Sequence, residues 1–159
     1  MRLFLAILLG LLALALTPAK ADPLADAAAK LPEGSYSDRV AQVRAIASLG
    51  DPRAIPLLEA LGEGDLHVRE SDGRIVIVKR EGREYFATDP ITGEILGTVG
   101  RRDTDKIRVN NLVRGTISEA LAQLNLASSD PDTRRIAAQE AAKYGSATML
   151  DRLRQAFEA

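Results

Sequence analysis

Few residues in this sequence are of a type that does chemistry. His67 is the only histidine, so a site with several histidine ligands is excluded, and a Ser-His-Asp triad would need this one ring. It alternates with apolar neighbours as a strand residue does, which favours a solvent-facing or rim position. Asp103 and Asp105, with Asp89 and Glu94 nearby in sequence, offer oxygen ligands for a hard cation, but their spacing is not that of a calcium-binding loop. Helix caps and turns explain these carboxylates better.

Other catalytic groups are missing from the sequence. There is no cysteine, so no thiol nucleophile and no disulfide framework exist. No glycine-rich segment ends in the Lys-Ser/Thr pair of a phosphate-binding loop. An enzyme that works with Asp or Glu alone is the least supported of three hypotheses, and we predict no catalytic residue, no cofactor and no metal site.

Basic residues concentrate in one run after residue 100. The run consists of Arg101, Arg102, Lys106, Arg108 and Arg114. It is interpreted either as a rim that contacts an acidic partner surface or anionic lipid headgroups, or as a solvated face interrupted by two aspartates. The pair Asn110 and Asn111 falls inside this run. A helix N-cap needs one asparagine, so a buried polar bracket between strand and helix is as plausible as surface exposure.

The first 21 residues have the pattern of a secretory signal peptide. Arg2 is followed by an apolar run from Leu3 to Leu16, and Ala19 and Ala21 are the small residues of a cleavage site. The apolar run is short for a membrane span, which needs about 20 residues. We expect cleavage before Asp22 and an exported, periplasmic domain of residues 22–159, with an uncleaved anchor as the alternative.

Charge excludes one class of partner. The formal net charge is −1, and it becomes more negative without Arg2 and Lys20 of the leader. Nucleic acid calls for a clustered basic face on a basic domain, so it is not an expected partner.

Helical hairpins are predicted at both ends of the domain. Residues 36–62 form the first, with Gly50 as the left-handed cap of one helix, and with Asp51 before Pro52 as the start of the next, at about residue 52. Residues 131–158 repeat the pattern. Ala-rich helices align easily by chance, and two copies are fewer than a free-standing solenoid needs.

Between the hairpins the pattern changes to strands. Residues 65–99 hold four short apolar or alternating runs separated by Gly- and Asp-bearing breaks, which predicts an antiparallel β-meander. A helix of about 104–126 follows, capped by Thr104 or Asn111, although Ile107 and Val109 alternate as a strand would. We therefore predict an α+β fold, in which HEAT-like helical hairpins and this helix share one core with the meander inserted between them.

The order of these parts resembles a known family. Hairpins carrying "GDPRAIPLLEAL" and "SDPDTRRIAAQEAA", a β insert with "DGRIVIV" and "DPITGEILG", and above all "KIRVNN" (Lys106–Asn111) are similar to the exported N-terminal extension of the urea-type ABC transporter permease subunit, in the branched-chain amino-acid permease family. In that family the chain continues into transmembrane helices, whereas this sequence ends at Ala159. No transport or ATP-binding residue can therefore be carried over.

The resemblance implies a role. The chain would be a non-catalytic extracytoplasmic accessory domain of a urea or amide importer, acting by contact with the permease transmembrane region or with the solute-binding protein. Membrane contact would come only through the partner or through headgroups. The alternative is a free-standing periplasmic HEAT-like interaction module unrelated to transport.

Overall fold

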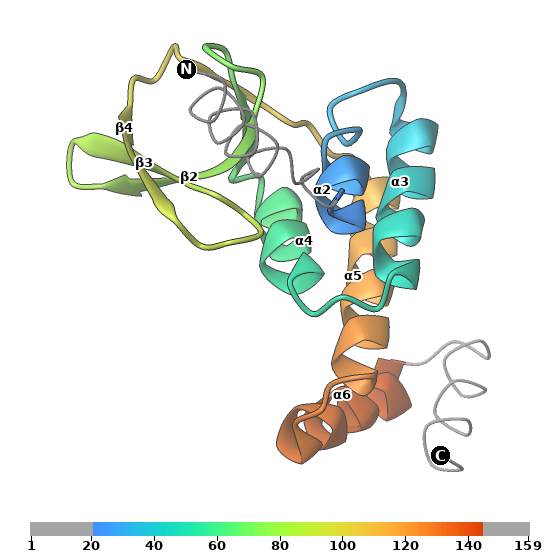
Figure 1. Cartoon of the computed structure of the whole chain (residues 1–159). Coiled ribbons are helices and arrows are strands. Elements are labelled where there is room, and N and C mark those ends of the chain that lie inside the picture. The colour runs from blue at the N-terminus through green and yellow to red at the C-terminus, as the bar shows by residue number, and fades with distance from the viewer. Residues whose placement is uncertain (1–20, 145–159) are drawn as a thin grey trace, which may run out of the picture.

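Helices and strands occupy separate parts of the chain, and the fold is mixed α+β (Figure 1). The computed structural model describes residues 21–144. Apart from Ala21, the predicted signal peptide lies outside the described residues, as does the second arm of the C-terminal hairpin. The described helices are α2 (Pro23–Ala28), α3 (Tyr36–Ser48), α4 (Ala54–Glu63), α5 (Asn111–Leu126) and α6 (Pro131–Tyr144). The strands are β1 (Leu66–Arg69), β2 (Ile75–Glu81), β3 (Glu84–Thr88), β4 (Ile95–Val99) and β5 (Thr104–Lys106).

Local signals set the ends of α3 as expected. Ser35 accepts a hydrogen bond from the Asp38 backbone N–H at 3.3 Å, and the Asp38 carboxylate accepts one from the Ser35 N–H at 2.8 Å. This reciprocal pair is a capping box, which satisfies two backbone donors that the helix leaves free. Gly50 follows the helix with φ 64°, a left-handed conformation that costs glycine little.

The start of α4 differs from the prediction by about half a turn. Asp51 caps no helix, because its carboxylate accepts the N–H of Arg53 at 2.9 Å and closes a turn through Pro52. The helix then begins at Ala54. Arg53 also reaches Asp22 at 2.8 Å, which ties the start of α2, an element that the sequence did not predict, to this turn.

The main core surrounds α5. Helices α3 and α4 both pack on it, and α2 packs on α3. Leu57, Leu58 and Leu61 of α4 are fully buried there, and Val113 of α5 is fully buried as well. The predicted contact between the first hairpin and the helix that ends at Leu126 is therefore confirmed.

The C-terminal helix does not share this core. Helix α6 packs on α5 near its C-terminal end (Figure 1). Among the side chains that the structure describes, none from α6 belongs to the main apolar cluster. The prediction of one core common to both hairpins is not confirmed, because the described side chains of α6 lie outside the main cluster and the second arm of this hairpin lies outside the described residues.

The sheet has one strand more than the predicted meander. Strands β1 to β4 confirm the four predicted runs, and β5 pairs antiparallel with β1, so the strand order is β4-β3-β2-β1-β5. The prediction of a helix beginning at about residue 104 is wrong for this stretch. Helix α5 begins at Asn111, because the segment before it is extended and bonds to β1: the Ile107 N–H donates to the Leu66 carbonyl at 3.0 Å.

This topology curls the sheet. Strands β4 and β5 lie at opposite edges, yet only residues 100–103 join them, and these contain a turn closed by the Asp103 N–H and the Gly100 carbonyl at 3.0 Å. A flat sheet of five strands would separate its edges by about 19 Å, at about 4.8 Å per strand. A turning link of this length does not span that distance. The sheet therefore has a convex face and a concave face.

Alternation along β2 separates the two faces. Ile75 joins the main core on the helices, whereas Val76 and Val78 join a small second cluster with Ala87 of β3. The second cluster is the floor of the concave face. Polar side chains farther along the same face complete a cavity, which is the candidate site.

Candidate functional site

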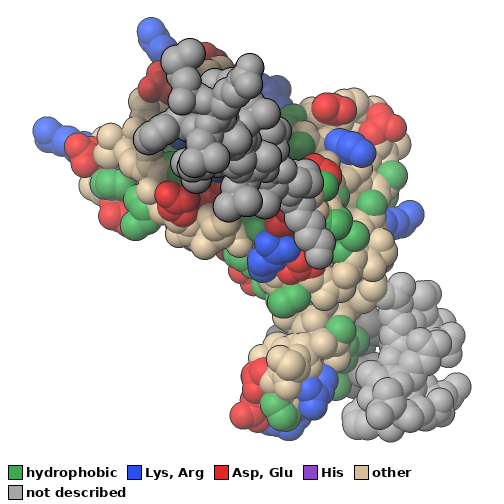
Figure 2. Space-filling model, in the orientation of Figure 1, with side chains coloured by type: hydrophobic (Ala, Val, Ile, Leu, Met, Phe, Trp, Pro, Cys, Tyr) green, Lys and Arg blue, Asp and Glu red, His purple; other side chains and the backbone are tan. Residues whose placement is uncertain are grey.

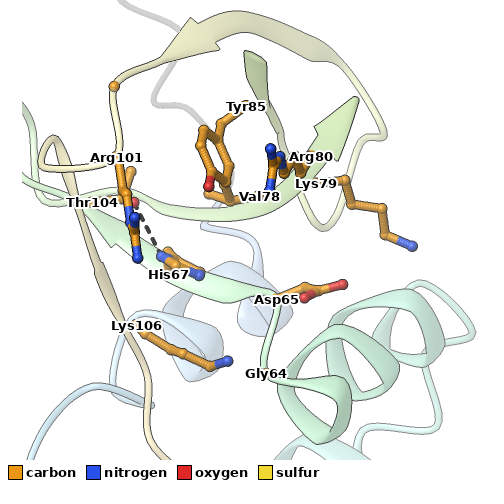
Figure 3. A pocket seen from close by; sticks show the side chains of 11 residues that line it. Gly64, Asp65, His67, Val78, Lys79, Arg80, Tyr85, Arg101, Thr104 and Lys106 are labelled. Atoms are coloured by element: carbon orange, nitrogen blue, oxygen red, sulfur yellow. Dashed lines mark hydrogen bonds between the residues drawn. The ribbon is translucent and has the colours of Figure 1, made fainter. Parts of the chain in front are cut away.

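The concave face of the sheet encloses a cavity of ≈ 390 Å³ (Figure 3). Its lining includes Val78 and Tyr85, together with Asp65 and His67. Arg80, Arg101 and Lys106 contribute three cationic side chains, whereas Lys79 borders the cavity with its side chain directed away from it. We call this cavity, with these three cations and His67, the basic hollow.

Strand register brings these residues together. His67 of β1 pairs with Lys106 of β5, and Arg80 of β2 pairs with Tyr85 of β3. Directly opposite residues of antiparallel strands point to the same face. The Arg80 guanidinium lies 6.0 Å from the centre of the Tyr85 ring, within the range of a cation–π contact. Arg101 enters from the link between β4 and β5.

The hollow carries an excess of positive charge. Among the side chains of residues 21–139, no carboxylate oxygen lies within 4 Å of the charged nitrogens of these three cations. Asp65 is the one acidic residue in its lining. A concave site with unpaired cations attracts anions more strongly than a flat surface does, because its walls reduce screening by water. On the face seen in Figure 2, acidic and basic side chains are interspersed instead.

Gly64 leaves room for the Lys106 side chain. Gly64 ends α4 with φ 83°, and a Cβ added there would lie 2.6 Å from the Lys106 ammonium nitrogen. The ammonium therefore lies close to the C-terminal end of α4, where the backbone carbonyl dipoles favour a cation. This contact holds Lys106 at the hollow without a carboxylate.

His67 lies half-buried in the wall of the hollow. Its Nδ1 is 3.1 Å from the hydroxyl oxygen of Thr104, shown as a dashed line in Figure 3. Burial lowers the pKa of His67, and the nearby Lys106 charge lowers it further, against the opposite effects of Asp65 and Asp105. The ring is therefore neutral near pH 7. The sequence predicted a solvent-facing or rim position for His67, and the structure shows it at the rim of the hollow.

The predicted basic rim does not form one surface. Arg101 and Lys106 line the hollow, whereas Arg108 lines, together with Lys106, a second cavity of ≈ 550 Å³ beside the start of α3. Arg114 donates to the carbonyl of Gly62 near the end of α4. Arg102 is exposed. Sequence reasoning missed Arg80, whose place at the hollow depends on the curl of the sheet.

Of the two alternatives for the asparagine pair, a buried bracket or surface exposure, the bracket is not observed. Asn110 is the N-cap of α5, and its side-chain oxygen accepts the Val113 N–H at 3.0 Å. Asn111 is exposed at the first position of the helix. One asparagine is thus an ordinary cap, and the other makes no link between strand and helix.

The side chain that makes this link is Arg39, which is 7% exposed. Its guanidinium donates to the carbonyls of Leu31 at 2.7 Å, Pro32 at 3.1 Å and Arg108 at 3.1 Å. These bonds join α3 to the loop before it and to the segment between β5 and α5. A planar group with several donors suits such a cluster of acceptors.

Replacing Asn110 by Ala tests the cap. Loss of a side-chain acceptor at an N-cap costs about 1 kcal/mol, so we expect the free energy of unfolding to fall by about that amount in urea titrations. The matched control is Asn111→Ala, which leaves the cap in place and should change stability by less than about 0.5 kcal/mol. Equal losses in the two variants would contradict the assignment of Asn110 as the cap.

Two of the four carboxylates considered for a metal, Asp89 and Asp103, serve turns. Asp89 accepts the N–H groups of Ile91 at 2.9 Å and Thr92 at 3.0 Å, and Asp103 accepts that of Gly100 at 2.8 Å. Within residues 21–144, no group of three or more potential metal ligands is found. No helix among these residues is long and apolar enough to cross a membrane.

Comparisons with known proteins give no relative. No protein-family model, no curated protein and no solved structure matches this chain. The site must therefore be interpreted from its own geometry.

Proposed function

We propose that this protein is a non-catalytic accessory domain that binds an acidic protein partner at the basic hollow. The observation that carries the proposal is the gathering of three cations, Arg80, Arg101 and Lys106, around one cavity, with no carboxylate oxygen within 4 Å among the described side chains. Unpaired surface charge of one sign steers a partner of opposite charge and fixes its orientation more than it raises affinity.

The resemblance of the sequence to the urea-type permease extension supports a more specific proposal. The domain is exported and acts at the outer face of the cytoplasmic membrane as part of a urea or amide ABC importer. Its partner is the solute-binding protein or the transmembrane region of the permease. The HEAT-like relation between its helical hairpins belongs to this proposal as well.

Association with these two importer proteins tests the function. We expect a weak complex with one of them in surface plasmon resonance, with an association rate that falls as salt is added, because salt screens long-range attraction. The double variant Arg101→Glu, Lys106→Glu should associate about tenfold more slowly or worse. Arg102→Glu changes a neighbouring exposed residue outside the hollow, and it should retain most of the rate.

The outcomes separate the candidates. Equal losses in the double variant and in Arg102→Glu would show that the effect comes from overall charge and not from the hollow. A protein that binds neither importer protein, even at low salt, would not be an importer subunit, and the alternative of a free-standing interaction module would replace the proposal.

A further inference from the structure

The free edge of the sheet runs beside the basic hollow. Among the described residues, strand β5 is terminal in the strand order, and no strand pairs with its outer side. The Ile107 N–H donates inward to Leu66, and because inward and outward groups alternate along a strand, the N–H and C=O of Lys106 point to the free side. The second cavity, of ≈ 550 Å³, lies along this same stretch between β5 and the start of α3. The free edge therefore has open space beside it.

Lys106 connects the edge to the hollow, because this residue lines both cavities and its side chain reaches Gly64 at the hollow. Figure 3 shows Lys106 and Arg101 on two sides of the His67 ring, whereas Lys79 extends away from them. Arg108 lines the second cavity, and so does the acidic residue Asp105 of β5. Cations thus lie on both sides of the backbone edge that is free to pair.

We infer that an extended acidic segment of the partner adds as a strand to the free edge of β5 and places carboxylates against Arg101 and Lys106 in the basic hollow. This inference rests on the proposed function and names how the partner binds. Backbone pairing at a sheet edge supplies affinity in known peptide-binding domains, and side-chain sites beside the edge supply specificity. Charge complementarity selects acidic side chains over others.

The opposite edge of the sheet is less suited to such pairing. In β4 the pairing with β3 shifts register next to Ala87, and Gly97 takes φ 98°. A bulge bends an edge strand and interrupts its row of free groups, which is a common protection against strand addition. The cations of the hollow also favour the β5 side, since Lys106 is itself part of β5.

The sole histidine reports on binding. We expect oligoglutamate to move the His67 ring signals in a saturable NMR titration, whereas oligoglutamine of the same length should not move them. Arg101→Glu combined with Lys106→Glu should weaken oligoglutamate binding about tenfold or more, and Arg102→Glu should leave it nearly unchanged. Inorganic phosphate is the third probe, because a site for any small anion would bind it as tightly as the peptide.

Amide hydrogen exchange tests the strand pairing separately. The Lys106 N–H points to the free side, so its exchange should slow when oligoglutamate binds. The Ile107 N–H is already bonded to Leu66 and serves as the internal control. A peptide that moves the His67 signals without slowing exchange at Lys106 would overturn the strand addition.

Binding should also depend on pH, with a defined sign. The ionisable groups that face His67 or line its cavity come from several elements: Asp65, Lys79, Arg80, Tyr85, Arg101, Asp105 and Lys106. A carboxylate added to this set stabilises the imidazolium, so the bound peptide should raise the pKa of His67. By linkage, affinity should then rise as pH falls through the range in which His67 titrates. Affinity that falls over this range would contradict a carboxylate at the ring.

The inference and the proposed function fail differently. If an importer protein binds but oligoglutamate does not, the inference of an acidic strand is wrong and the proposed function stands. The same conclusion follows if inorganic phosphate binds the hollow as tightly as the peptide does. If oligoglutamate binds as described but neither importer protein does, the hollow is a peptide site and the importer proposal is wrong.

Discussion

Replacing Arg39 by Met should lower the free energy of unfolding by roughly 2 to 5 kcal/mol. Methionine fills much of the same volume but donates no hydrogen bond, so the carbonyls of Leu31, Pro32 and Arg108 lose their donor. Each buried carbonyl left without a partner costs about 1–3 kcal/mol.

Two further variants serve as controls for Arg39→Met. Arg39→Lys keeps the charge but not the planar fork, so its loss of stability should be smaller than that of Arg39→Met but still measurable against the wild type. Arg44→Met changes an exposed arginine of the same helix and should cost less than about 0.5 kcal/mol in the same urea titrations. A loss that small in Arg39→Met would show that water reaches the three carbonyls.

The elements that were predicted correctly have signals within a few residues. The apolar alternation that predicts β2 and β3 is local, and so is the turn between them, where Gly82 takes φ 62° as the expected hairpin requires. Gly50 ends α3 in the same way. Such signals depend only on backbone sterics and on the period of apolar residues, so they can be interpreted without knowledge of the fold.

The features that were missed depend on residues far apart in the chain. Strand β5 has three residues and no pattern that distinguishes it from a loop, and it becomes a strand only because β1 is available to pair with it. The bond from Arg39 to Arg108 joins positions 69 residues apart. The basic hollow requires both the β5 pairing and the curl of the sheet. The basic residues after residue 100 could therefore predict a positive charge in this segment, but not the cavity at which some of them lie.

The second large effect is expected for Leu58→Ala in α4. Leu58 is 0% exposed, and its helix packs against α5 and β1, so the change removes apolar contacts at the junction of helices and sheet. Large-to-small changes at such sites cost about 2–5 kcal/mol, because lost burial and a residual cavity both contribute. Urea titrations followed by circular dichroism measure this loss.

Leu112→Ala is the matched control, since the same atoms are removed from a leucine that is 60% exposed. It should cost less than about 0.5 kcal/mol, and a loss that small in Leu58→Ala would mean that α4 is not packed in the core. Because Leu58 does not line the hollow, Leu58→Ala that is still folded should bind oligoglutamate as the wild type does. If the folded Leu58→Ala variant no longer binds oligoglutamate, the space left by the leucine side chain has shifted β1 and its residue His67. Packing of the core would then affect the geometry of the hollow.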